Sequence, residues 1–387
     1  MIGSLEQLLD SFYYRIKLAC DKFLTRTYWQ LELSLFCVLL MFFLCPPSFE
    51  NLSTVSNRTW EVVLKQIDNH TLQYAVENPN SHESKRTFRL TVPLLCKLIG
   101  LRDIRLIYTL QVFFTVFFFW LLARFSQRLS RDSMVAVLLP ISFCFTAIGQ
   151  VGVFDVYAKF DSFALFFLLA AIAFENPAII LFSIILGGFT DERAFIASPM
   201  VLIWWQMQAE RDFNIPVKKV IRLNARSFAV LFGMIGYLLL RLYLIKRYDL
   251  VTVFGDIGFS IMQGQQNMYY FGTWTAFEGF WLVVLLAMVL LYCHRCYVLL
   301  TLLLVVGIPS LLVAHFVIDI TRSMIYAMPL VFISLKIISR QSASLFFGRL
   351  MILIVLINLL VPTYWAFGNS TIVTHFSFLH KLFGKFF

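Results

Sequence analysis

Residues 161–208 read DSFALFFLLAAIAFENPAIILFSIILGGFTDERAFIASPMVLIWWQMQ, and this stretch decides the class of fold. Three apolar runs, 162–174, 178–190 and 194–208, follow one another with only a few polar residues between them. Such runs predict helices in lipid, but the first two are too short to cross a hydrocarbon core of roughly 30 Å as straight helices. We therefore expect short or re-entrant helices here, with a bend at Pro177.

The composition of the whole chain agrees with helices in lipid. Of 387 residues, 60% are hydrophobic and only 14% are charged, whereas soluble domains have roughly 45–50% apolar and about 25% charged residues. This excludes a cytosolic enzyme, a disordered chain, a disulfide scaffold and a collagen-like fibre. Ten-residue stretches of alternating polarity are absent, which argues against an outer-membrane barrel. The predicted class is an all-α polytopic membrane protein.

Further apolar runs on both sides of this stretch extend the prediction to about eleven transmembrane helices, short or re-entrant ones included. The additional runs are 31–45, 104–123, 133–149, 227–245, 275–292, 297–317, 320–335 and 348–366. Together they define a transmembrane domain over residues 31–366.

The segments outside these runs suggest three peripheral parts. Residues 1–30 are amphipathic and mixed in charge, which predicts a cytoplasmic helix lying on the membrane. Residues 47–103 form a long extracytoplasmic loop with two amphipathic patterns of its own. Residues 367–387 form an extracytoplasmic amphipathic tail.

The net charge of +10 is informative about the orientation of the chain in the membrane rather than about its binding partners. Lys and Arg in the short connections favour a cytoplasmic N-terminus by the positive-inside rule. No nucleic-acid-binding motif is present, so membrane lipid is the expected partner and nucleic acid is not. The bacterial inner membrane is favoured over the endoplasmic reticulum, and protein partners are not indicated.

On this orientation, polar residues gather in compact groups at the extracytoplasmic ends of the spans. The groups are 81–89, 155–161, 190–193, 263–267 and 319–322, the last preceded by His315. Ionisable residues at membrane depth are costly unless they pair or line a water-filled cavity. We therefore expect these distant groups to converge in one polar, water-accessible cavity.

Each group also has a purely structural interpretation. Asp319 and Arg322 are spaced to pair on one helical turn, and Asp161 is placed to cap the following helix. Lys159 and Arg193 could extend to the interface, and 81–89 could be a solvated loop. The triplet Asp191-Glu192-Arg193 is hardest to explain this way, because it follows Gly187-Gly188 and interrupts an apolar stretch.

Carboxylates and cations at the headgroup plane suit chemistry on a lipid-linked substrate. A carboxylate can act as general base toward a sugar hydroxyl or hold a divalent cation. Arg and Lys can neutralise a phosphate, and Arg can do so with two parallel hydrogen bonds. A polyprenyl-phosphate donor would place its phosphate here while its tail stayed in lipid.

The layout resembles the GT-C superfamily of integral-membrane glycosyltransferases. The similar features are the long first outer loop, the succession of short spans over 133–208, and the acids in Phe154-Asp155 through Asp161 and in Gly187-Gly188-Phe189-Thr190-Asp191-Glu192-Arg193. The resemblance implies transfer of a sugar from a lipid-phosphate-linked donor, often with a divalent metal. It also implies an acid early in the first outer loop, where this chain has only isolated acids such as Glu50, Glu61 and Asp68.

These considerations give a set of candidate roles, listed here by type. The candidate catalytic residues are Asp155, Asp191 and Glu192. The candidate substrate-binding residues are Arg86, Arg89, Lys159, Arg193, Arg322 and His82. The candidate ligands of a divalent cation, Mg or Mn, are Asp161 and Asp319.

Two other functions fit the same features. A polysaccharide polymerase or ligase acting on polyprenyl-pyrophosphate glycans would depend more on the arginines than on the acids. A lipid or solute transporter would explain the Gly- and Pro-interrupted helices. However, charges at one face rather than at the midplane, and the lack of repeated halves, argue against transport.

Overall fold

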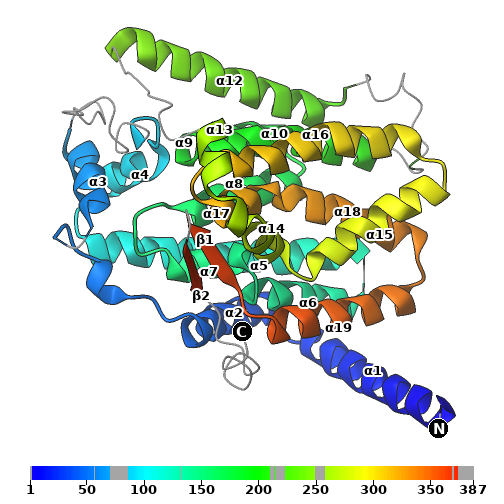
Figure 1. Ribbon diagram of the computed structural model, residues 1–387. Helices are drawn as coiled ribbons and strands as arrows, with labels where there is room; N and C mark the ends of the chain where they lie inside the picture. The colour runs from blue at the N-terminus through cyan, green and yellow to red at the C-terminus, as the bar shows by residue number, and fades with distance from the viewer. Residues whose placement is uncertain are drawn as a thin grey trace.

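The computed structural model describes residues 2–55, 57–69, 86–130, 132–209, 213, 223–248, 258–367 and 370–373. Helices make up most of these residues, and the strands β1 (Tyr364–Phe367) and β2 (Ser370–Val373) form one antiparallel pair. The chain is therefore all-α in class, as predicted (Figure 1).

The first half of the chain contains the N-terminal helix, the long first loop (47–103) and the first helices of the bundle. Its elements are α1 (Ile2–Leu24), α2 (Trp29–Leu44), the 3-10 turn η1 (Phe49–Asn51), α3 (Arg58–Asp68), α4 (Thr91–Ile99), α5 (Ile104–Ser130), α6 (Ser133–Cys144), α7 (Ala147–Phe154), α8 (Asp161–Ala173), α9 (Pro177–Thr190) and α10 (Glu192–Ala209).

The second half adds one long outer helix and then completes the body. Its helical elements are α12 (Ala225–Tyr248), α13 (Phe259–Gly264), η3 (Gln266–Met268), α14 (Tyr269–Phe277), α15 (Phe280–Cys293), α16 (Tyr297–His315), α17 (Ile320–Met324), η4 (Ile325–Ala327), α18 (Met328–Gln341) and α19 (Ser344–Leu360).

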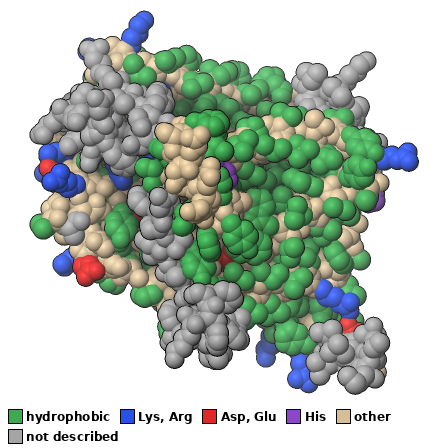
Figure 2. Space-filling model, in the orientation of Figure 1, with side chains coloured by type: hydrophobic (Ala, Val, Ile, Leu, Met, Phe, Trp, Pro, Cys, Tyr) green, Lys and Arg blue, Asp and Glu red, His purple; other side chains and the backbone are tan. Residues whose placement is uncertain are grey.

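Four of the described helical stretches are long and apolar enough to cross a membrane: Ile104–Ser130, Ala225–Tyr248, Tyr297–His315 and Ile320–Gln341. The number rises to seven if each strongly bent helix pair counts as one span. Hydrophobic side chains cover most of the central part of the face shown in Figure 2, and Lys and Arg lie mainly at its periphery. These are the features of an integral membrane protein, whereas eleven crossings remain a prediction.

Each of the eleven apolar runs contains a helix, but the bounds differ at the last run. The helix predicted within 348–366 ends at Leu360, and Tyr364 already belongs to strand β1. Pro362 explains the early end, because a proline has no N–H to continue the helix and restricts the residue before it to extended conformations.

Three helix pairs are sharply bent at short breaks. α1 and α2 meet at 116°, α6 and α7 at 57°, and α14 and α15 at 83°. The break between α14 and α15 contains Glu278, which has a φ of 47° although it is not glycine. The first bend turns α1 away from the body (Figure 1), as the predicted surface helix requires, but the position of a membrane around it is a prediction.

The short helices α8 and α9 pack against each other and against α10, and α12 lies over α9 at the edge of the molecule (Figure 1). Close approach of α9 and α12 depends on glycine. A Cβ on Gly188 would lie 2.8 Å from the Tyr237 ring, and one on Gly233 would lie 2.9 Å from the side chain of Ile184. Away from α9, α12 exposes apolar side chains such as Phe232 and Leu239.

The long first loop packs onto the ends of α7, α8 and α9. The indole N–H of Trp60, a fully buried residue of α3, donates to the carbonyl of Val156 at 2.9 Å. The Thr91 hydroxyl at the start of α4 donates to the carbonyl of Leu186 at 2.8 Å. The loop therefore covers the helix ends that carry the predicted polar groups.

Candidate functional site

The connection from α7 to α8 is wound around the carboxylate of Asp155. Its Oδ1 accepts the backbone N–H of Tyr157, and its Oδ2 accepts those of Lys159 and Phe160 at 3.0 and 2.8 Å. Ala158 and Phe160 adopt left-handed backbone conformations, with φ of 54° and 61°. Such strained conformations persist only where the surroundings impose them, so Asp155 fixes the loop that presents Lys159 and Asp161.

Arg86, from the first loop, supports the same connection. Its Nη1 donates to the carbonyl of Ala158 at 3.0 Å, and the side chain is buried. The backbone carbonyl of Arg86 in turn lies near the amide of Gln66 on α3. Arg86 is therefore bound to the protein backbone in this structure, at the edge of the predicted site.

The turn between α9 and α10 places Asp191 against its own neighbour Arg193. The Arg193 guanidinium donates from Nε to Oδ1 at 2.7 Å and from Nη2 to Oδ2 at 2.6 Å, a bidentate pair. The backbone N–H of Arg193 also donates to Oδ1. Asp191 thus caps the start of α10 and holds the guanidinium in one orientation.

Asp161, the first residue of α8, lies beside this pair and has no exposed surface. Its Oδ2 accepts from Nε of Arg322 at 2.5 Å, and its Oδ1 accepts from the Tyr326 hydroxyl at 2.5 Å. Nη2 of Arg193 reaches the same Oδ1 at 3.4 Å, and Nη2 of Arg322 reaches Asp191 at 3.4 Å. The two carboxylates and two arginines therefore form one network.

Arg89 lies in the first loop just before α4 and brings a third guanidinium to Asp191. Its Nη2 lies 3.0 Å from Oδ2 of Asp191, and its side chain is 15% exposed. Its Nε is buried and has no hydrogen-bond partner among the described residues. Asp161, Asp191, Arg89, Arg193, Arg322 and Tyr326 are called the ionic cluster below.

A second pair, Lys159 and Asp319, lies at the edge of the ionic cluster. Nζ of Lys159 is 3.3 Å from Oδ2 of Asp319, with 22% of the lysine side chain exposed. Asp319 also caps α17 by accepting the backbone N–H of Arg322. The predicted pairing of the Asp319 and Arg322 side chains is therefore wrong: the Arg322 guanidinium contacts Asp161 and Asp191, and Asp319 pairs with Lys159 from a distant group.

The ionic cluster carries one positive charge in excess, because it holds three arginines and two carboxylates. The arginines are Arg89, Arg193 and Arg322, and the carboxylates are Asp161 and Asp191. Buried charges are tolerated only when they are paired and hydrogen-bonded, which the network achieves for the acids. The excess positive charge and the unused Arg89 donor favour an anionic ligand.

Burial and neighbouring charges set the protonation of the residues in the loops and turns of the site. Burial alone would raise the pKa of Asp191, but the charges of Arg193 and Arg89 hold that pKa below its usual range. Burial, together with the charge of Asp161, raises the pKa of Asp155. Burial lowers the pKa of Lys159, against the attraction of Asp319. Asp191 is therefore a poor proton acceptor at neutral pH.

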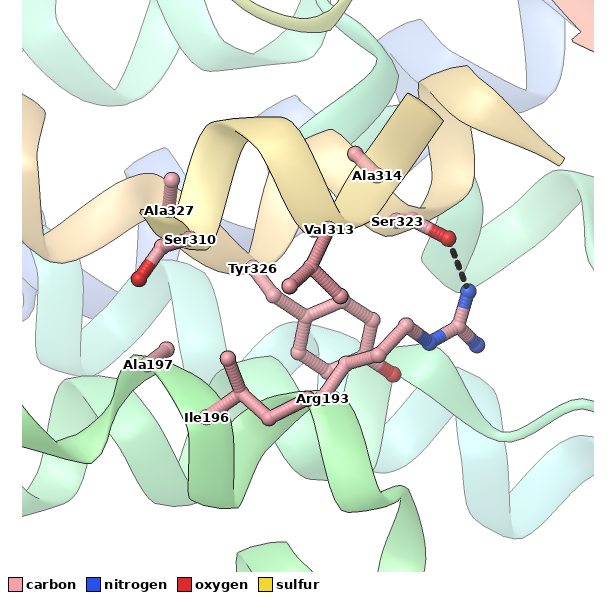
Figure 3. Close-up of a pocket in the computed structure, with 9 residues that line it drawn as sticks. All are labelled: Arg193, Ile196, Ala197, Ser310, Val313, Ala314, Ser323, Tyr326 and Ala327. Carbon is pink, nitrogen blue, oxygen red and sulfur yellow. Dashed lines mark hydrogen bonds between the residues drawn. The ribbon is translucent and has the colours of Figure 1, made fainter. Parts of the chain in front are cut away.

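A small pocket lies against the ionic cluster, between α10, α16 and α17 (Figure 3). Arg193 enters it from α10, and its Nη1 donates to the Ser323 hydroxyl at 2.9 Å. The Tyr326 ring lies beside the guanidinium, 4.9 Å from ring centroid to Cζ. The other lining residues are apolar apart from Ser310: Ile196, Ala197, Val313, Ala314 and Ala327.

The structure brings most of the predicted site residues together, from segments far apart in the chain. Glu192 is half-buried beside them and makes no hydrogen bond or ion pair with another described residue. His82 lies outside the described residues. Gln265, from the fourth polar group, donates to the carbonyls of His315 and Val317 and so supports the segment leading to Asp319.

The predicted cavity differs from the observed site in its access to water. Asp161 and Asp191 are fully buried, so the site in this structure is a closed network beside a small pocket. The reason is that the acids and bases neutralise one another, and paired charges can be packed where unpaired ones would need water. Opening the site requires that a ligand replace some of these pairs.

Sequence reasoning did not single out Tyr326 and Ser323. Tyr326 follows Arg322 by four residues and Ser323 follows it directly, so both lie on the segment that carries a predicted site residue. The i, i+4 spacing of Arg322 and Tyr326 was the available signal, since residues so spaced share a helix face.

The fit of a divalent cation to the predicted ligands is poor in this arrangement. Asp161 is surrounded by Arg193, Arg322 and the Tyr326 hydroxyl, and Asp319 by Lys159. No group of three or more His, Cys, Asp or Glu able to hold a metal occurs among the described residues. Cations next to each carboxylate repel a metal ion, and a divalent cation at this site stays a prediction.

Comparison of the chain with known protein families, with curated proteins and with solved structures finds no match. Functional inference therefore depends on the site itself.

Proposed function

We propose that this chain is a membrane glycosyltransferase of the GT-C type that takes a sugar from a lipid-phosphate-linked donor at the extracytoplasmic face. In this proposal the chain crosses or enters the membrane with eleven helical segments, in the bacterial inner membrane rather than the endoplasmic reticulum. The observation that supports it most is the convergence of Arg89, Arg193 and Arg322 at helix ends, beside an apolar-lined pocket.

The three guanidinium groups suit the phosphate of the donor. Each can donate more than one hydrogen bond to phosphate oxygens, and Nε of Arg89 is available without displacing a described partner. The wall formed by Ile196, Val313 and Ala314 is apolar, but the pocket holds only about 10 Å³, so the first carbons of the lipid tail would have to widen it. A phosphate bound here would accept some of the guanidinium hydrogen bonds that Asp161 and Asp191 accept in this structure.

Glu192 is the residue we assign as general base. Asp191 is held ionised by three arginines, and both carboxylate oxygens of Asp155 already accept backbone N–H groups, whereas Glu192 makes no such contact with a described residue. In the transfer step the acceptor hydroxyl gives its proton to the Glu192 carboxylate and bonds to C1 of the sugar. The bond from C1 to the phosphate oxygen breaks, and the electron pair leaves with the lipid phosphate, held by the arginines.

Substitution of Glu192 by Gln tests this assignment. We expect transfer from a radiolabelled polyprenyl-phosphate sugar to fall at least about 100-fold, with the melting temperature unchanged. Glu61→Gln is the matched control, because Glu61 is exposed and pairs only with Lys65 within α3. Normal transfer by the Glu192→Gln protein would rule Glu192 out as the base.

Phosphate recognition is tested separately by binding. A polyprenyl monophosphate and the corresponding polyprenol are titrated into the protein in lipid nanodiscs. We expect only the phosphate to bind, and Arg89→Lys to weaken it about tenfold, since a charged hydrogen bond contributes about 1.5–3 kcal/mol. Arg349→Lys, at the other end of the bundle, is the control. Equal binding of the alcohol and the phosphate would contradict the proposal.

A polymerase or ligase acting on polyprenyl-pyrophosphate glycans is the second candidate. The excess of arginine over carboxylate, and the poor fit of the acids to a divalent cation, favour it. Two assays separate the candidates: tighter binding of polyprenyl pyrophosphate than of monophosphate supports the polymerase or ligase, and loss of transfer in EDTA supports a metal-dependent glycosyltransferase.

A further inference from the structure

A second buried polar site lies where two broken helices meet, away from the proposed transfer chemistry. Glu278 occupies the break between α14 and α15 and has no exposed surface. Its backbone has φ 47° and ψ −120°, a conformation that residues with a side chain rarely adopt. Backbone strain of this kind persists where surrounding contacts impose it and is frequent at functional positions.

The surroundings of Glu278 are rich in uncharged hydrogen-bonding groups. The break between α6 and α7 provides the carbonyl of Phe145, α7 provides the amide of Gln150, and the segment after α19 provides the hydroxyl of Thr363. Asn358, on α19, accepts the N–H of Gly279 and donates to the hydroxyl of Ser142. The glutamate is thus enclosed by polar groups that carry no charge.

No cation in the sequence nearby is available to neutralise a glutamate. The segments 133–154, 269–293 and 350–367 contain no Asp, Glu, Lys, Arg or His other than Glu278 itself. Their other titratable residues are Cys144, Tyr269, Tyr270, Tyr292, Cys293 and Tyr364. The Tyr269 hydroxyl donates to the carbonyl of Met262, and the Cys144 thiol donates to the carbonyl of Pro140.

The neighbouring helices α16, α17 and α18 do carry titratable groups, but these are engaged elsewhere. Arg322 pairs with Asp161, Nζ of Lys336 donates to the carbonyl of Leu129, and Arg340 donates to the carbonyl of Met207. His315 lies 3.3 Å from the hydroxyl of Thr273. An ionised Glu278 would therefore be a buried charge without a counterion, which is strongly unfavourable.

The hydrogen atoms around Thr363 can be counted. Its Oγ1 lies 2.6 Å from Oε1 of Glu278 and 2.7 Å from the carbonyl oxygen of Phe145. Two such short oxygen–oxygen contacts each need a hydrogen between the atoms. A threonine hydroxyl has one hydrogen and a carbonyl has none, so the second hydrogen must belong to Glu278.

The remaining carboxyl oxygen agrees with this count. Oε2 of Glu278 is buried and has no hydrogen-bond partner among the described residues. An ionised carboxylate would need donors on both oxygens, whereas a neutral acid that donates from Oε1 leaves only a carbonyl-like oxygen unpaired. Thr363 Oγ1 then accepts from Glu278 and from Nε2 of Gln150, 3.3 Å away, and donates to Phe145, which uses its full capacity.

We propose that Glu278 is a proton-binding site, at which a neutral carboxylic acid donates to Thr363 and holds together the two helix breaks. The reaction is the dissociation of the Oε–H bond, with the proton passing to water and the charge remaining on the carboxylate. This site is independent of sugar transfer. Thr275, three residues before Glu278, lies 3.4 Å from Thr321, the residue before Arg322.

Infrared difference spectroscopy on the full chain in nanodiscs tests the proposal directly. At neutral pH, where exposed carboxyl groups are ionised, we expect a protonated-carboxyl C=O band that is lost in Glu278→Gln and kept in Glu61→Gln. Thr363→Val should shift the same band to higher frequency, because the acid loses its acceptor. This second variant tests the assignment even if Glu278→Gln does not fold. A spectrum unchanged by Thr363→Val would overturn the proposal.

Stability against pH gives a second, independent test. A group protonated when folded and ionised when unfolded makes unfolding release a proton, so the folding equilibrium weakens tenfold per pH unit above the unfolded pKa of about 4.3. As pH rises, the folding equilibrium constant of the wild type should therefore fall tenfold per pH unit relative to that of Glu278→Gln. The fall should stop at the pH where Glu278 ionises in the folded state. Parallel pH profiles, or a wild-type stability that depends on sodium instead of pH, would contradict proton binding.

Discussion

Charged residues lie at both ends of the helical bundle, but they are buried at one end and largely exposed at the other. At the end that carries the ionic cluster, Asp161 and Asp191 are fully buried and each contacts at least two arginines. At the other end, Arg226 pairs with Glu175 with side-chain exposures of 36% and 66%, and Arg349 pairs with Asp10 with both about half exposed.

The opposite end also uses its cations locally. Lys336 and Ser339 donate to the carbonyl of Leu129 near the end of α5, and Arg340 donates to the carbonyl of Met207 near the end of α10. Cations there complement the unpaired carbonyls of helix C-termini. Asp132 caps α6 by accepting the N–H of Met134. These contacts complete helix ends, and Asp132 also accepts from the Ser344 hydroxyl at the start of α19.

Composition alone does not distinguish a structural charge from a functional one. Both ends contain arginines and acids at helix termini, which the sequence presents alike. Only the ionic cluster removes its charges from solvent, where an exposed pair contributes little and a buried one becomes costly to disturb.

Asp191→Asn should have the largest effect on stability. The change leaves Arg89, Arg193 and Arg322 with excess buried positive charge, and breaking a buried ion pair costs about 3–5 kcal/mol. Thermal or denaturant unfolding in detergent measures it. A loss below that of Asp10→Asn at the opposite end would remove the distinction between the two ends.

Arg193→Lys should have the next largest effect. Lysine keeps the charge but cannot make the two parallel hydrogen bonds to Asp191 or reach Ser323 at the same time. The expected loss is about 1.5–3 kcal/mol. Arg226→Lys, which alters an exposed pair, is the matched control and should be nearly silent.

Acidification should weaken the protein through Asp191. Its folded pKa lies below the unfolded value of about 3.9, so below that pH the unfolded chain binds a proton that the folded chain does not. Stability from this group is complete above about pH 4 and falls by about 1.4 kcal/mol per pH unit below it. Unfolding measured from pH 5 to pH 3 should show a shallower decline in Asp191→Asn.

Glu175→Gln should have the smallest effect. Its pair with Arg226 is largely exposed, and such pairs contribute about 0–1 kcal/mol. The effect should vanish as salt is raised, because ions screen exposed charges. A loss as large as that of Asp191→Asn, or one insensitive to salt, would show that the two ends are alike.

Several features of the fold followed from the sequence. Apolar runs separated by Pro, Gly and charged residues predicted the helices. The bend predicted at Pro177 lies at the start of α9, where Asn176 accepts the N–H of Ala178. The strand after Leu360 was missed, because Tyr364, Trp365 and Phe367 are as apolar as the helix before them.

The site was predictable as a set of residues but not as an arrangement. Arg193 and Asp191 are two residues apart, and the sequence placed them in one polar group without indicating that they pair. The contact between Asp161 and Tyr326 spans 165 positions in the chain, which no local pattern reveals. Glu278 appeared only as one acid in an apolar run, and its enclosure depends on α6, α7 and α19.

The sequence by itself determined the solvent, the helices and the short list of polar residues, because hydrophobicity and helix-breaking residues act over a few positions. The tertiary structure decided which charges neutralise one another and which are left with spare donors. That decision depends on distances across the bundle and on the exclusion of water, and both arise only when separate helices pack together.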